Sequence, residues 1–228
     1  MLEAGLHFGH SASTSHPRMK PFLFGTRNGV QIIDLEKASE KFEEALKFIQ
    51  KLTKEGGTLL LVGTKIHVRK MLKETAEECG LPYVSERWLG GTFTNFETIK
   101  KRVNYLKGLE KKKAEGLLDK YTKKEKAEIE KEIKGLEERL GGIKNLETLP
   151  QAIFVCDMKK DLLAVREARQ KNVKIIGLAD TNIDPSLADY PIPANDDAAN
   201  AVKYILDKIK ETVLNNQVKK VEESDAKH

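Results

Sequence analysis

Two kinds of apolar run alternate along most of the chain. One kind is short and continuous, which is typical of strands buried on both faces of a parallel sheet. The other repeats apolar residues every three or four positions, which predicts amphipathic helices. The strand-like runs are residues 58–62, 83–85, 152–156, 174–179 and 191–193, and the helix-like runs are residues 34–55, 65–79, 161–170 and 198–214. This alternation predicts an α/β fold built on a doubly wound parallel sheet with right-handed crossovers.

The N-terminal part of the chain does not follow this alternation. Residues 1–21 contain Gly5, Pro17 and Pro21, which interrupt any period, so this segment is expected to be irregular. Asn28-Gly29 then separates two apolar stretches. Because both residues of this pair tolerate a positive φ, it predicts a tight β-hairpin turn.

Charged residues dominate residues 96–148, where apolar residues recur with the four–three spacing of a heptad repeat. The two apolar stripes consist of Ile99, Val103, Leu106 and Leu109 and of Ile129, Ile133, Leu136, Leu140 and Ile143. Residues 116–121 resemble a turn, and Thr122 with Glu125 forms a capping box. We therefore expect an antiparallel coiled-coil helical hairpin at 96–148, inserted into an α/β domain made of residues 22–95 and 149–214. The polar tail, residues 215–228, is expected to be disordered.

Composition places the chain among globular proteins with an ionic surface. It has 228 residues, 40 Lys and Arg, 35 Asp and Glu, and a formal net charge of +5. That balance favours a polyanionic partner, although weakly. The two cysteines are far apart and indicate no disulfide framework, as in a reducing compartment. No run is long enough for a membrane span and no signal pattern precedes the first motif, so we expect a cytoplasmic protein with no membrane partner.

Catalytic chemistry has little support in the residue pattern. Gly63-Thr64-Lys65 follows a strand but lacks the second glycine of a phosphate-binding loop, so a tight turn is favoured over a nucleotide site. The carboxylates between residues 180 and 197 favour turn and helix-cap roles over a Mg²⁺ site. The pair His7 and His10 has no further residue at metal-ligand spacing. We expect no enzyme activity, no cofactor and no metal.

The segment around Leu89-Gly90-Gly91 supports two interpretations. Its glycines release the chain into the inserted hairpin, or its backbone amides, beside Arg87 and Trp88, grip an RNA sugar–phosphate turn. The sequence does not separate these alternatives.

Basic residues carry more information than any catalytic motif. Arg18, Lys20 and Arg27 are interspersed with phenylalanines and glycines, a composition common in RNA-binding arms. Residues 97–148 contain 15 Lys and Arg against 11 Asp and Glu, with basic clusters at 100–102 and 111–113. Part of this charge belongs to a solvated helical surface. The clusters nevertheless favour contact with a nucleic-acid backbone.

Five stretches of the chain carry a family resemblance: LEAGLHFGH (residues 2–10), MKPFLFGTRNG (19–29), RWLGGTFTNF (87–96), DTNIDP (180–185) and DYPIPANDDA (189–198). In these stretches the chain resembles the bacterial small-subunit ribosomal protein S-two family (universal ribosomal protein uS-two). The resemblance implies a flavodoxin-like domain with a coiled-coil hairpin, and a structural role in the small ribosomal subunit. It implies contact with small-subunit rRNA near the head–body junction and with other small-subunit ribosomal proteins, including the large mRNA-binding protein S-one where the organism has one.

We expect rRNA to be held mainly through its phosphates. The candidate RNA-binding residues are Arg18, Lys20, Arg27, Arg87, Lys100, Lys101 and Arg102. Two other classes stay open at this point: a nucleotide-dependent enzyme on the same α/β core, and a coiled-coil adaptor that binds no RNA.

Overall fold

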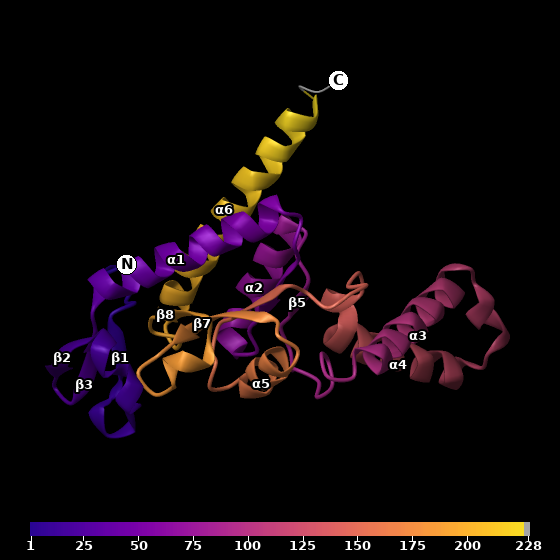
Figure 1. Ribbon diagram of the computed structural model, residues 1–228. Helices are drawn as coiled ribbons and strands as arrows, with labels where there is room; N and C mark the ends of the chain where they lie inside the picture. The colour runs from indigo at the N-terminus through magenta and orange to yellow at the C-terminus, as the bar shows by residue number, and fades with distance from the viewer. Residues whose placement is uncertain (226–228) are drawn as a thin grey trace.

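The computed structural model describes residues 1–225 of the chain. Figure 1 shows an α/β core, a small antiparallel sheet at the N-terminal side, and a helical hairpin that projects from the opposite side of the core. Among the described helices, none has an apolar run long enough to cross a membrane.

The core is a five-stranded parallel sheet with the strand order β5-β4-β6-β7-β8. Its strands are β4 (Leu59–Val62), β5 (Tyr83–Val84), β6 (Ala152–Val155), β7 (Lys174–Ala179) and β8 (Tyr190–Pro193). The chain enters the sheet at β4 and passes to β5 at one edge. It then crosses back over β4 to β6, β7 and β8 in turn. This is the strand order of the flavodoxin-like fold, so the predicted fold class is confirmed. The proline-containing strand β8 lies at an edge, as predicted.

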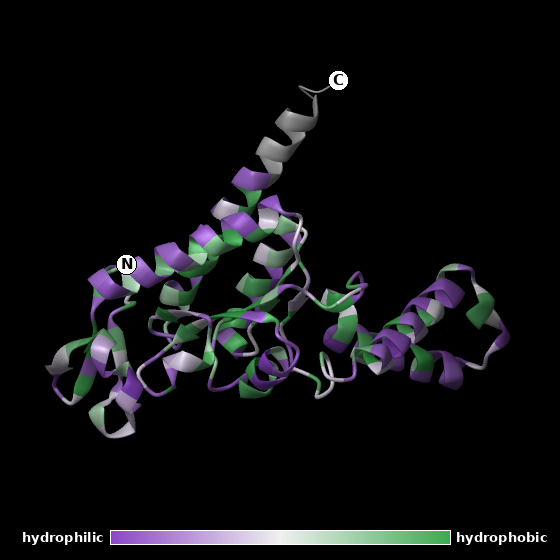
Figure 2. Ribbon diagram, viewed as in Figure 1, coloured by the Kyte–Doolittle hydropathy of each residue, from purple (hydrophilic) through white to green (hydrophobic). Residues whose placement is uncertain are grey.

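Helices cover both faces of this sheet. They are α1 (Leu35–Lys54), α2 (Ile66–Cys79), α5 (Leu162–Gln170) and α6 (Ala199–Asp225). Alternate strand residues point to opposite faces, so Leu59 and Leu61 join one hydrophobic core with α1, α2 and α6. Leu60 and Val62 join a second core with α5. In Figure 2, α1 is hydrophilic along its outer edge and hydrophobic toward the sheet.

Local signals define the ends of several helices as predicted. Asp34 caps α1 by accepting hydrogen bonds from the backbone N–H groups of Glu36 and Lys37. Gly80 ends α2 in the left-handed region, with φ 66°. These caps fix where each helix begins or ends relative to the sheet.

The N-terminal segment is more regular than its glycines and prolines predicted. Residues 1–21 contain strand β1 (Phe8–Ser11) and the short 3-10 helix η1 (Ala12–Thr14), and most of a second, η2 (Pro17–Phe22). Strand β1 pairs with β3 (Val30–Ile33), which also pairs with β2 (Leu23–Arg27), in a three-stranded antiparallel sheet. Asn28 and Gly29 have φ values of 51° and 79°, which confirms the predicted hairpin turn.

The hairpin consists of α3 (Phe96–Ala114) and α4 (Lys123–Leu140), which lie side by side in Figure 1. A 3-10 turn η3 (Leu117–Lys120) joins them, and η4 (Gly141–Ile143) leads back toward the core. The predicted capping box of Thr122 and Glu125 is present. The predicted stripe of α3 is buried, whereas Ile129, Ile133 and Leu136 of α4 are half-buried. The two helices therefore pack through the predicted faces.

The last helix is longer than predicted. Helix α6 continues through Asp225, whereas the loss of apolar periodicity predicted an end at residue 214 and a disordered tail from 215. Asn216 explains the first part of the extension, because its buried side-chain amide donates to the Gln50 carbonyl at 3.1 Å and to Thr53 Oγ1 at 2.7 Å. A polar residue therefore docks this turn onto α1. Residues 226–228 lie outside the described residues.

Candidate nucleic-acid interface

The predicted RNA-binding residues lie in three separate places. Arg18, Lys20 and Arg27 belong to the N-terminal sheet and its 3-10 helix, Arg87 precedes the loop that enters the hairpin, and Lys100, Lys101 and Arg102 lie in α3 near its start. Figure 1 shows the N-terminal sheet and the hairpin on opposite sides of the α/β core. The seven residues therefore do not form one compact site. A long, flexible polyanion is the kind of partner that can reach several such places.

Arg18 is already paired within the protein. Its Nη1 atom lies 2.6 Å from Asp184 Oδ2 and 2.7 Å from Ser186 Oγ. Asp184 also caps η5 (Pro185–Leu187) by accepting from the Ser186 N–H, which confirms the predicted cap role of this carboxylate. Arg18 thus joins the N-terminal segment to the core, although its side chain stays exposed.

Lys20 and Arg27 differ from Arg18, because none of the side chains or backbone groups that the structure describes forms an ion pair or a hydrogen bond with their side chains. Both are exposed. Arg27 ends strand β2 beside the Asn28-Gly29 turn, at the tip of the small hairpin. A charged side chain at such a tip loses little packing when it turns toward a partner.

Arg87 is exposed, but the amides beside it are not available to a ligand. The buried Glu167 carboxylate of α5 accepts hydrogen bonds from the N–H groups of Gly91 at 2.8 Å and Phe93 at 2.9 Å. The Thr94 N–H donates to the same carboxylate at 3.2 Å. Of the two interpretations of this loop, the cradle for an RNA phosphate is therefore wrong, because an internal anion occupies the amides. The side chain of Arg87 stays exposed beside these amides.

The hairpin start presents two exposed cations. Lys101 and Arg102 have no ion pair with another described residue, whereas the Lys100 ammonium donates to the Glu147 carbonyl at 3.2 Å. Lys100 therefore ties α3 to the returning chain. Further along the hairpin, Lys113 pairs with Glu130 of α4 at 3.1 Å, so part of the basic surface is neutralised within the hairpin.

A cluster that the sequence did not predict lies at the carboxyl ends of β4 and β6. Lys65 follows β4, and its Nζ lies 2.8 Å from Asp157 Oδ2, 2.7 Å from Asp196 Oδ1 and 2.7 Å from Asp197 Oδ1. In this fold, the strand order reverses between β4 and β6, which is where such proteins bind their cofactors. Here an internal ion-pair network lies at that position.

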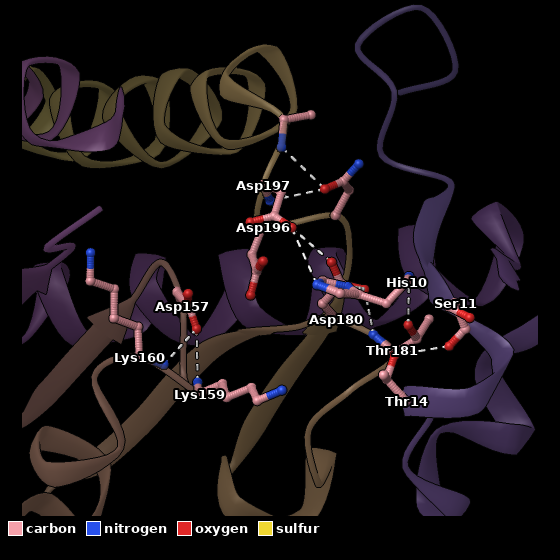
Figure 3. A network of polar contacts seen from close by, with 12 residues as sticks. His10, Ser11, Thr14, Asp157, Lys159, Lys160, Asp180, Thr181, Asp196 and Asp197 are labelled. Carbon is pink, nitrogen blue, oxygen red and sulfur yellow. Dashed lines mark hydrogen bonds and ion pairs between the residues drawn. The ribbon is translucent and has the colours of Figure 1, made fainter. Parts of the chain in front are cut away.

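The same cluster holds the N-terminal sheet. His10 of β1 lies between two carboxylates, with Nδ1 3.2 Å from Asp180 Oδ1 and Nε2 3.2 Å from Asp197 Oδ2, as Figure 3 shows. The His10 backbone N–H also donates to Thr181 Oγ1 at 2.9 Å. His7 does not share these contacts. Among the side chains that the structure describes, no group of three or more His, Cys, Asp or Glu has a geometry that could hold a metal ion.

Burial and mutual repulsion shift the pKa values of this cluster. Burial raises the pKa of Asp196 to about 7, and the charges of Asp157 and Asp180 add to that increase. Burial alone would lower the pKa of Lys65, but hydrogen bonds to three carboxylates outweigh it and raise the pKa. The Thr64 hydroxyl donates to Asp161 Oδ1 at 2.9 Å, so the predicted tight turn after β4 is also internally satisfied. The hydrogen bond between Thr64 and Asp161 therefore holds the turn after β4 against the start of α5.

Sequence reasoning missed the Lys65 cluster and Glu167 because their partners are distant along the chain. The paired Asp196-Asp197 and the lysine after a buried strand were visible. Knowledge of the strand order would have placed both at the same edge of the sheet. No comparable local signal marks Glu167.

Comparison with known families agrees with this architecture. A family described as Ribosomal protein S2 matches residues 1–216 of the 228-residue chain. The match spans the N-terminal sheet, the α/β core and the hairpin, together with most of α6. The chain therefore belongs to the ribosomal protein S2 family, whose members are structural, rRNA-binding proteins of the small ribosomal subunit.

Proposed function

We propose that the protein binds small-subunit rRNA near the head–body junction and supports translation as a non-catalytic part of the cytoplasmic ribosome. The supporting observation is the separation of its free cations. Lys20 and Arg27 lie on one side of the core and Lys101 and Arg102 on the other, each exposed and without an ion pair to a described residue. Unpaired cations lose no internal contact when they neutralise a phosphate, so they favour backbone binding.

Arg18 and Lys100 take a secondary role in this proposal. Each already bonds within the protein, Arg18 to Asp184 and Lys100 to the Glu147 carbonyl. An RNA phosphate would have to share or replace that partner. Their main contribution is to hold the two RNA-binding regions against the core.

Contact with a neighbouring ribosomal protein, such as S-one, is the finer part of the proposal. An apolar area over the N-terminal sheet supports it, because Phe24 is 82% exposed and Phe8 is 50% exposed. Leu2 is 66% exposed, and it lines one surface depression together with Phe24 and Ile32. Exposed aromatic side chains of this kind are enriched in protein–protein interfaces.

Filter binding of purified protein to small-subunit rRNA over a range of salt concentrations tests the proposal. The double variant Lys101→Glu with Arg102→Glu should bind less tightly and show a smaller slope of log affinity against log salt. The matched control is Lys47→Glu with Lys54→Glu, which reverses two exposed charges on α1 without an ion pair among the described residues. Equal losses in the two double variants would contradict specific contacts at the hairpin start.

Sucrose-gradient fractionation separates this function from the two alternatives. The tagged protein should sediment with small subunits, and the Lys101→Glu, Arg102→Glu variant should shift toward the top of the gradient. An adaptor that binds no RNA would stay at the top in both forms. A nucleotide-dependent enzyme would instead show a raised melting temperature with ATP or NAD.

A further inference from the structure

The loop that leads into the hairpin is folded around an internal carboxylate. Glu167 is 5% exposed, and its two oxygens accept from Gly91, Phe93 and Thr94 N–H groups at 2.8 to 3.2 Å. The Thr94 hydroxyl lies 3.3 Å from Oε2 and adds a fourth donor. Successive amides that curve toward one point form a typical anion-binding nest. Here the anion is supplied by α5 of the same chain.

The nest is the junction between the core and the hairpin. Arg87 lies four residues before Gly91, and α3 starts at Phe96, two residues after Thr94. Two aromatic rings fix the loop on the inside, since Trp88 and Phe93 are buried and meet edge to face at 4.9 Å. Gly91 has a φ of 92°, which other residues rarely adopt. The direction in which α3 leaves the core therefore depends on this loop.

A buried carboxylate is unfavourable unless donors compensate it. Glu167 accepts hydrogen bonds from residues 91–94, and the Trp88 side chain also stabilises its charge, so among the described residues the carboxylate serves this loop. Burial alone would raise the pKa of Glu167, but hydrogen bonds from the backbone of Phe93, Gly91 and Thr94 outweigh it and lower the pKa. The group is therefore an anion at neutral pH.

We propose that Glu167 is a positioning residue for RNA binding, which fixes Arg87 and the direction of the hairpin relative to the core. This inference rests on the proposed rRNA binding. Glu167 is too buried to touch RNA itself, and it acts through the residues on either side of the nest. A loosened loop would leave Lys101 and Arg102 folded on α3 but no longer held at a fixed angle to the N-terminal sheet.

The first test uses the free protein and the variant Glu167→Gln, which keeps the shape of the side chain and removes its charge. Trp88 is the single tryptophan of the chain, so its fluorescence reports on this loop alone. We expect a shift of its emission to longer wavelength, together with faster hydrogen exchange at the Gly91, Phe93 and Thr94 amides. Unchanged emission and exchange would overturn the role of the carboxylate.

The second test measures rRNA affinity at fixed salt. Glu167→Gln should bind about tenfold more weakly, the effect of losing one charge-assisted hydrogen bond. Glu167→Asp, which restores the charge on a shorter side chain, should recover part of that loss. If Glu167→Gln does not fold, Gly91→Ala disturbs the same loop from the other side and should show the same loss. Full affinity in a variant whose Trp88 emission has shifted would overturn the proposal.

A double-mutant cycle separates positioning from a merely structural effect. If Glu167 acts through Arg87, then Arg87→Ala should cost less affinity in the Glu167→Gln background than in the wild type. The control is Asp189→Asn, which removes a carboxylate that accepts from the Ile175 N–H at 3.0 Å in another part of the core. Its effect should add to that of Arg87→Ala. Additivity in both cycles would contradict the proposal.

Failure of this inference differs from failure of the proposed function. If the wild-type protein does not bind rRNA in a salt-dependent way, the proposed function falls, and the role of Glu167 in RNA binding falls with it. If the wild type binds but the affinity of Glu167→Gln is unchanged, rRNA binding stands and only the positioning role is lost.

Discussion

The ammonium of Lys65 lies 2.7 Å from the carboxylate of Asp196, across the carboxyl ends of β4 and β8. Its other partners, Asp157 and Asp197, come from the end of β6 and the segment before α6. One side chain thus joins three segments of the core: those that follow β4, β6 and β8. His10 extends the same network to the N-terminal sheet through Asp180 and Asp197. An ion-pair network thus lies where this fold usually binds a ligand, and it holds the N-terminal sheet against the core.

Removal of the central cation should destabilise the protein strongly. Lys65→Met leaves Asp157 and Asp196 close together and buried, and breaking a buried pair costs about 3–5 kcal/mol. Urea unfolding followed by circular dichroism measures the change. The control is Lys70→Met, which removes an exposed ion pair with Glu74 on α2, the helix that Lys65 precedes. This change should lower the unfolding free energy by less than about 1 kcal/mol. Similar losses for both variants would contradict a central role for Lys65.

The stability of the protein should depend on pH through Asp196. Its pKa is raised from 3.8 to about 7, so between these values the folded state holds a proton that the unfolded state has lost. The contribution of Asp196 to stability therefore falls as the pH rises through this window, by up to about 1.4 kcal/mol per pH unit. Asp157, Asp180 and Lys65 surround the group, and the raised pKa of Lys65 keeps it charged throughout.

The variant Asp196→Asn isolates this effect. The difference in unfolding free energy, variant minus wild type, should increase from pH 4 to pH 7 and then level off. Urea titrations at half-unit pH steps measure it, and titrating groups that do not interact with Asp196 cancel in the difference. A flat difference would show that the Asp196 carboxyl titrates alike in the folded and unfolded chains.

Local chemistry made much of the fold predictable. Asp34 caps α1, Asn28 and Gly29 turn the small hairpin, and Thr122 closes a capping box with Glu125, because each signal acts over two to four residues. Continuous apolar runs predicted the parallel strands, because a strand that is covered on both faces of the sheet is apolar at successive positions. The α/β class and the inserted hairpin followed from these elements in order.

Long-range contacts account for what was not predicted. Lys65 and Asp196 are 131 residues apart, and Glu167 is 74 residues from Phe93, so no local pattern joins them. Strand β1 forms because β3 offers it an edge, despite the glycines around it. Arg18 was predicted to bind RNA, but it pairs with Asp184 within the chain. The sequence did not indicate this pair, because the two residues are 166 positions apart.

Arg27 and Arg18 should behave differently when truncated. Arg27→Ala removes an exposed, unpaired cation, so thermal stability should stay unchanged while the salt slope of rRNA binding falls by about 1. Arg18→Ala also leaves Asp184 without its guanidinium, and should lower the melting temperature. Thermal melts and filter binding on the same preparations distinguish the two. An unchanged salt slope for Arg27→Ala would remove this residue from the RNA-binding surface.

Two glycines of the hairpin should respond in opposite ways to alanine. Gly142 lies where the hairpin returns to β5, and a Cβ atom there would overlap the Tyr83 carbonyl oxygen and touch the Tyr83 ring. The backbone of Tyr83 belongs to a strand and cannot easily retreat, so Gly142→Ala should destabilise by about 1–3 kcal/mol. Gly108 lies inside α3 with nothing within 4 Å of its Cβ position. Gly108→Ala should therefore stabilise by about 0.5–1 kcal/mol through helix propensity. Urea unfolding of both variants measures these changes. No loss for Gly142→Ala would contradict the close approach of Gly142 to Tyr83, and a loss for Gly108→Ala would contradict the open space around the Gly108 Cβ position.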